Sequence, residues 1–78
     1  AAEEPLLRLE RVAVVREALK ELSEDHRAIL VLREMEGFSY EEISEITQIS
    51  IGTVRSRLSR ARSQLKLLIE SISQDPLS

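Results

Sequence analysis

The feature that most constrains the fold of this chain is the spacing of its apolar residues, which recur at intervals of three and four. Such intervals place side chains on one face of an α-helix. Only two glycines and two prolines interrupt the 78 residues, and strong helix formers make up much of the rest. The sequence therefore predicts an all-α fold, a four-helix domain with helices near 6–22, 24–36, 40–46 and 51–73.

Single residues that can begin or end a helix separate these segments. Ser23 and Ser50 can cap the helices that follow them, because a serine hydroxyl accepts a hydrogen bond from a free backbone N–H. Gly37 can end the second helix in the left-handed conformation. Ser39 and Glu42 are spaced as a capping box, which predicts that the third helix begins beside them.

We expect an aliphatic core, since aromatic residues make up only 3% of the chain. The second helix is expected to face inward through residues that include Ala28 and Met35. The predicted core contains Leu19, Leu22, Ile29, Leu32, Ile43, Ile46, Val54, Leu58 and Leu65.

Further apolar residues near the two ends exceed what one small core requires. Two interpretations remain open at this point: the first and last helices pack on each other here, or they form a surface for a protein partner. The residues concerned are Leu6, Leu7, Leu67, Leu68, Ile69 and Ile72.

Positive charge is concentrated in one segment of a chain whose net charge is −3. That net charge alone argues mildly against nucleic-acid binding. Residues 51–66, however, carry five cations and no acid, and the local field governs the attraction of phosphates. Arginines on a helix are usually only a solvated face, but their concentration without acids favours a nucleic-acid surface. The five cations are Arg55, Arg57, Arg60, Arg62 and Lys66.

The basic segment follows a short helix and a tight turn at 47–49, which is the order of a helix-turn-helix at about 39–62. At 100° per residue, Val54, Leu58, Ala61 and Leu65 share one face of the last helix, which is expected to be buried. The opposite face is mostly small, which suits close approach to a major groove. It collects Gly52, Thr53, Ser56, Ser59, Arg60 and Ser63.

Long cationic side chains complete this surface. Arg60 is the long donor best aimed at the groove floor, where an arginine can make a bidentate contact to guanine. Arg55, Arg62 and Lys66 lie along one flank of the helix and Arg57 along the other, where they can reach phosphates.

The sequence lacks the residue patterns that metal binding, catalysis or membrane insertion would require. The chain has no cysteine, and the single histidine, His26, has no second ligand at metal spacing. No strained nucleophile turn and no calcium loop is present, so we expect no enzymatic activity, no cofactor and no metal. No apolar run approaches the ~20 residues needed to span a bilayer, and the acidic first ten residues do not resemble a signal peptide. We therefore expect a cytoplasmic protein without a membrane segment.

Three strings of the chain resemble region 4 of the sigma-70 family, and within it the extracytoplasmic-function (ECF) group. They are LSEDHR at 22–27, LREMEGFSYEEI at 32–43 and GTVRSRLSRAR at 52–62, and the resemblance extends over about residues 10–68. The chain departs at Ser23, where the family usually has proline, and at Ser44, where alanine is common. The resemblance implies a winged-helix-like, sigma region 4 type of fold with a long C-terminal recognition helix.

The same resemblance implies the DNA-binding domain of a bacterial RNA polymerase sigma factor, acting at the nucleoid. Such domains recognise the promoter −35 element, dock on the flap of the polymerase beta subunit and are commonly masked by an anti-sigma factor. It implies that residues 1–5 end an inter-domain linker, that 6–73 form domain 4, that 74–78 are a tail, and that domain 2 lies elsewhere. We expect the domain to be monomeric.

By position, the resemblance assigns base reading to Arg55, Ser56, Ser59 and Arg60, and phosphate contacts to the helix starts at Ser39, Tyr40 and Thr53. Two alternatives are a LuxR-type regulator output domain and a helical interaction module that binds no DNA. The complete set of predicted DNA-binding residues is Ser39, Tyr40, Gly52, Thr53, Arg55, Ser56, Arg57, Ser59, Arg60 and Arg62.

Overall fold

The computed structural model describes residues 5–73, and every regular element in that range is helical, which confirms the predicted all-α fold. The predicted linker end and tail fall largely on residues 1–4 and 74–78, which lie outside the described residues. The elements are α1 (Pro5–Glu21), α2 (Glu24–Leu30), the π-helical turn η1 (Val31–Met35), α3 (Tyr40–Thr47) and α4 (Ile51–Ser73).

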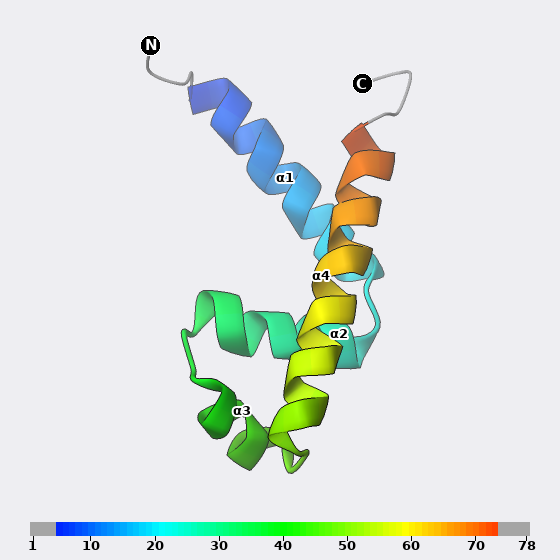
Figure 1. Ribbon diagram of the computed structural model, residues 1–78. Helices are drawn as coiled ribbons and strands as arrows, with labels where there is room; N and C mark the ends of the chain where they lie inside the picture. The colour runs from blue at the N-terminus through cyan, green and yellow to red at the C-terminus, as the bar shows by residue number, and fades with distance from the viewer. Residues whose placement is uncertain (1–4, 74–78) are drawn as a thin grey trace.

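The long helix α4 organises the domain, because α1, α2 and α3 each pack against it. Figure 1 shows α3 beside the first turns of α4, α2 crossing its middle, and α1 meeting it above that crossing. Beyond their meeting point, α1 and the last turns of α4 diverge like the arms of a V. The structure measures 42 × 26 × 17 Å along its principal axes. The basic half of α4 and the arms of the V thus lie at opposite ends of the domain.

The second predicted helix, 24–36, is confirmed as a continuous helical segment, but its hydrogen bonding changes near its end. It is α-helical only to Leu30 and continues as the π-helical turn η1, in which the N–H of Glu36 donates to the carbonyl of Val31 at 3.0 Å. Bonds to the fifth residue back turn the chain through a smaller angle per residue than an α-helix does. Side chains near the end of the segment therefore leave the predicted face: Met35, expected inside, is 63% exposed. Ala28 is exposed as well.

The predicted helix boundaries at the helix-turn-helix are confirmed. Gly37 adopts a left-handed φ of 74° after η1. The Ser39 hydroxyl accepts from the Glu42 N–H at 3.0 Å, and the Glu42 carboxylate accepts from the Ser39 N–H at 2.8 Å, completing the capping box. Ser50 accepts from the Thr53 N–H at 3.1 Å at the start of α4. These bonds cap the N-termini of α3 and α4.

Eight of the nine residues of the predicted core list are buried or pack against the core. Leu22, Ile29, Ile43, Val54 and Leu58 are buried as expected, together with Ala18, Leu30 and Ala61. The predicted residues Leu19, Leu32 and Leu65 are partly buried and pack against this cluster, as Phe38 and Ile49 also do.

Ile46 was predicted to be buried, and this is wrong: its side chain is 53% exposed. The inward face of α3 contains Tyr40, Ile43, Ser44 and Thr47, which are buried or partly buried and are spaced by three and four residues. Ile46 lies beyond the edge of that face, and Ile49 in the following turn packs against the core.

Candidate nucleic-acid interface

The outer face of α4 consists mainly of exposed small residues. Gly52, Ser56, Ser59 and Arg60 are exposed, whereas Val54, Leu58 and Ala61 on the opposite face are buried. The two faces of this helix are therefore oriented as its periodicity predicts. A Cβ atom built on Gly52 would meet only the Ser50 hydroxyl oxygen, at 4.0 Å, so packing does not require a glycine there. Because glycine has no side chain, nothing projects from the helix surface at this position near the start of α4.

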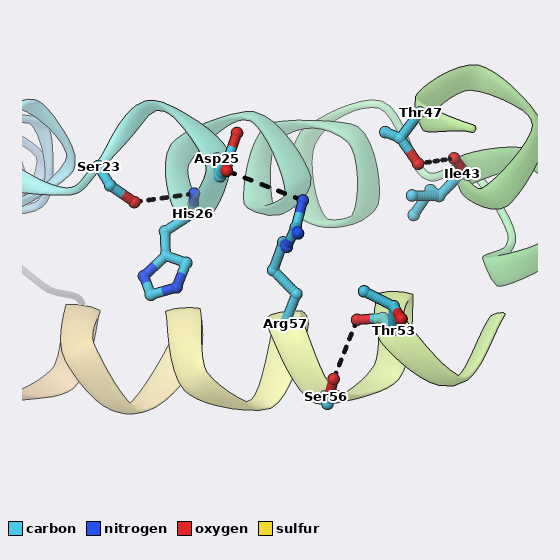
Figure 2. A network of polar contacts seen from close by, with 8 residues as sticks. All are labelled: Ser23, Asp25, His26, Ile43, Thr47, Thr53, Ser56 and Arg57. Carbon is cyan, nitrogen blue, oxygen red and sulfur yellow. Dashed lines mark hydrogen bonds and ion pairs between the residues drawn. The ribbon is translucent and has the colours of Figure 1, made fainter. Parts of the chain in front are cut away.

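Hydroxyl groups line the first turns of α4. The Ser50 hydroxyl donates to Thr53 Oγ1 at 2.9 Å, and the Ser56 hydroxyl donates to the Thr53 carbonyl at 3.2 Å, as Figure 2 shows for the second bond. Because the Ser56 proton is used within the helix, its hydroxyl presents an acceptor to an external partner. Thr53 itself is half-buried, whereas Ser56 is exposed.

Tyr40, the first residue of α3, lies close to two guanidinium groups. Arg33 Cζ lies 4.9 Å and Arg55 Cζ 5.8 Å from the centre of its ring, both within the range of cation–π attraction. Arg33 also donates to the Phe38 carbonyl at 2.8 Å. Tyr40 packs against the core with its partly buried ring. The predicted residues Tyr40 and Arg55 are thus brought together, although they come from different helices.

Arg33 was not among the predicted residues. It lies on η1, before the turn at Gly37, so no helical periodicity relates it to Tyr40. The only available signal in the sequence is a cation close to an aromatic residue, which does not by itself predict a contact.

Two arginines on the flanks of α4 lie close to acidic residues, one on α2 and one on η1. Arg57 Nη1 lies 4.0 Å from Asp25 Oδ2 on α2 (Figure 2). Arg62 approaches a single carboxylate oxygen of Glu34 with two nitrogens, Nη2 at 2.7 Å and Nε at 2.9 Å. The hydrogen bond to Glu34 raises the pKa of Arg62, and Tyr40 acts in the same direction. Both arginines, which were predicted to reach phosphates, thus have anionic partners within the domain, and their contact with phosphates stays a prediction.

Arg60 differs from these two flank residues. Within residues 5–73, neither a hydrogen bond nor an ion pair is recorded for its side chain, which is exposed on the outer face of α4. It is surrounded on that face by small residues and is available to a ligand. No group of three His, Asp or Glu side chains in the described part of the chain is placed to hold a metal ion.

Comparison with known proteins identifies the family of this arrangement. The family described as Sigma-70, region 4 matches residues 13–65, most of the chain. The chain belongs to this family. The sigma-70 region 4 match begins within α1, includes the whole helix-turn-helix and ends in α4.

Relatives of this region 4 domain support the same assignment. The RNA polymerase sigma-H factor of Pseudomonas aeruginosa is 41% identical over 73 residues, which are 94% of this chain and 38% of that protein. The ECF RNA polymerase sigma-E factor of Haemophilus influenzae is 40% identical over 70 residues, covering 90% of this chain and 37% of that protein. The ECF RNA polymerase sigma-E factor of Escherichia coli K12 is 49% identical over 49 residues, which are 63% of this chain and 26% of that protein.

The predicted resemblance to region 4 of ECF sigma factors is confirmed by these matches. The chain spans less than two fifths of the length of the first two relatives.

Proposed function

We propose that this domain recognises the −35 element of bacterial promoters and docks on the flap of the RNA polymerase beta subunit during transcription initiation. The observation that carries the proposal is the outer face of α4, where small exposed residues surround the exposed side chain of Arg60. Such a face can approach base edges closely while Arg60 reaches the groove floor. Relatives named as RNA polymerase sigma factors support the same function.

Within this proposal the residues divide by the part of DNA they contact. Arg55, Ser56, Ser59 and Arg60 face base edges, since they lie on the exposed side of the first turns of α4. Arg55 is held near the groove by the Tyr40 ring, 5.8 Å away. The helix starts and flanks contact phosphates, because backbone N–H groups and cations there attract anions. These residues are Ser39, Tyr40, Gly52, Thr53 and Arg57. Arg62 can join them only when it leaves Glu34.

A selection of bound duplexes from a random pool tests the DNA part of this proposal. One enriched motif, bound more tightly than scrambled duplex across several salt concentrations, is the expected result. A helical interaction module that binds no DNA predicts no retardation of any duplex even at low salt. A LuxR-type output domain would bind DNA but not the isolated beta flap, so a titration with that flap separates the remaining alternative.

The arms of the V supply a surface for a protein partner. An open groove of about 710 Å³ lies between α1 and the end of α4, and Leu7, which lines it, is 53% exposed. Leu67 is 60% exposed but does not line this groove. Leu68 packs against the core, and Ile69 and Ile72 are partly buried. Packing within the domain therefore accounts for part of the apolar residues near the two ends, but not for all of them. The side chain of Leu6 lies outside the described residues. The groove is lined by Leu7, Glu10, Arg11, Val14, Val15, Ile69, Ile72 and Ser73.

We propose that the polymerase flap or an anti-sigma factor occupies this groove. No helix in the described range is long and apolar enough to cross a membrane. The proposed setting is the bacterial nucleoid in the cytoplasm, with the domain itself monomeric. The proposed role is binding, which requires neither catalysis nor a cofactor.

Replacing both Leu7 and Ile72 with serine tests the groove, since both side chains line it. Leu7 is 53% exposed and Ile72 is only partly buried, so the double variant is expected to lose only about 1 kcal/mol of the free energy of unfolding. Its affinity for the isolated flap is expected to fall at least about tenfold, because apolar anchors are removed. The matched control is Leu68→Ser, which is expected to destabilise the domain more, since Leu68 packs against the core. A large loss of stability in the double variant without any partner would show that the two helices serve mainly to pack on each other.

A further inference from the structure

Glu34 makes the most closely spaced ion pair between helical elements recorded for the described residues. Its carboxylate oxygen Oε1 accepts from both Nε and Nη2 of Arg62, at 2.9 and 2.7 Å, across 28 positions of sequence. The pair joins η1 to α4 on the side where Leu30, Leu65 and Lys66 form a shallow apolar surface. Arg62 is therefore held toward η1 along its whole guanidinium edge.

This ion pair is half-exposed: the Arg62 side chain is 47% and the Glu34 side chain 51% accessible. Pairs in such a position contribute only about 0–1 kcal/mol to stability, because water screens the charges. The main physical consequence of the pair is the position of the arginine. Arg62 lies on the same flank of α4 as Arg55, which faces the start of α3. A cation at that place can pair with Glu34 or, in the proposed complex, with a phosphate of the DNA backbone.

We propose that Glu34 competes with DNA phosphate for Arg62 and thereby lowers the sequence-independent affinity of the domain. The inference rests on the proposed DNA-binding function of α4. Every phosphate contact contributes affinity without sequence information, and it steepens the slope of log affinity against log salt by about 0.9. By occupying Arg62, Glu34 removes one such contact from complexes with random DNA. The acid limits how strongly the domain is retained on the bulk of the chromosome.

The second pair across the helices is weaker evidence for the same effect. Arg57 and Asp25 are separated by 4.0 Å, and the Asp25 side chain is 76% exposed. A single long contact restrains the arginine less than two short ones do. The competition is therefore assigned to Glu34.

Glu34→Gln tests the competition by titration of a random duplex at several salt concentrations. The variant is expected to bind more tightly than the unaltered chain, with a slope steeper by up to about 0.9, the value for one full phosphate contact. The gain in affinity is expected to be at most about fivefold, because a half-exposed ion pair can hold Arg62 back by no more than about that factor, and to shrink as salt rises. The melting midpoint should change little, because the side chain is half-exposed.

Glu36→Gln is the matched control, since it removes the same charge from an exposed residue two positions away for which the described residues provide no cationic partner. It measures the general repulsion between an acid and DNA. The effect of Glu34→Gln must exceed that of Glu36→Gln, and it must shrink to the control value when Arg62 is also changed to Gln. Equal effects of the two variants, or an undiminished effect without Arg62, would overturn the proposal.

The result of this titration can be distinguished from the result of the duplex selection that tests the proposed function. Failure to enrich a duplex motif would reject −35 recognition, while the random-duplex titration would still report on Glu34. If Glu34→Gln gained affinity only while Lys66 was present, the acid would act through Lys66, which lies on the same surface, and the assignment to Arg62 would be wrong.

Discussion

Replacing Val54 with aspartate is expected to abolish the cooperative unfolding of this domain. Val54 is 0% exposed and lies on the face of α4 that packs with Ile43 and Leu58 in the core. No polar or charged residue is buried among the described residues, so the new carboxylate would have no partner. An unpaired buried charge costs several kcal/mol, which is comparable with the whole stability of a small domain. Circular dichroism during a thermal scan measures the loss.

Ile46→Asp provides the matched control. The same substitution is made on α3 at a side chain that is 53% exposed, so a cooperative melt with only a small change of midpoint is expected. The opposite pattern, in which the Ile46 variant unfolds and the Val54 variant melts cooperatively, would show that the inner and outer faces of α3 and α4 are assigned wrongly.

The fold was largely predictable because its signals are local. The bounds predicted for α4, 51–73, agree with Ile51–Ser73, since the Ser50 cap and the spacing of Val54, Leu58 and Ala61 are properties of the helix itself. The π-helical turn η1 was not predictable in the same way. Apolar spacing at 3.6 residues per turn contains no sign of a segment whose hydrogen bonds reach the fifth residue back.

The same distinction applies to the candidate site: features of a single helix were predictable, and contacts between helices were not. Helical periodicity alone correctly separated the buried face of α4 from its exposed face. It could not identify the partners of the flank cations, because Glu34 lies 28 positions before Arg62 and Arg33 reaches Tyr40 across the turn at Gly37. Which of the five cations remains available to DNA is therefore decided by tertiary contacts.

Arg60→Ala is expected to cost roughly 1–3 kcal/mol of binding free energy on the preferred duplex and to relax the preference at one base position. The reason is that a bidentate contact to guanine is lost, which no small neighbour on that face can replace. Arg60 is suited to this contact because it is exposed on the outer face of α4, with no acid recorded beside it among residues 5–73. Titration of the variant against preferred and scrambled duplexes at several salt concentrations measures the difference.

Arg62→Ala is the control that distinguishes base reading from phosphate binding. It removes an equal charge two residues away, but Glu34 already holds that guanidinium at 2.7 Å. We therefore expect small and similar losses on both duplexes, whereas full use of Arg62 as a phosphate contact would reduce the salt slope by roughly one. For Arg60→Ala the loss must be concentrated on the preferred duplex, because a contact to a base edge exists only where that base is present. Equal losses on preferred and scrambled duplexes would mean that Arg60 contacts the backbone, and that the outer face of α4 does not enter the groove in the proposed orientation.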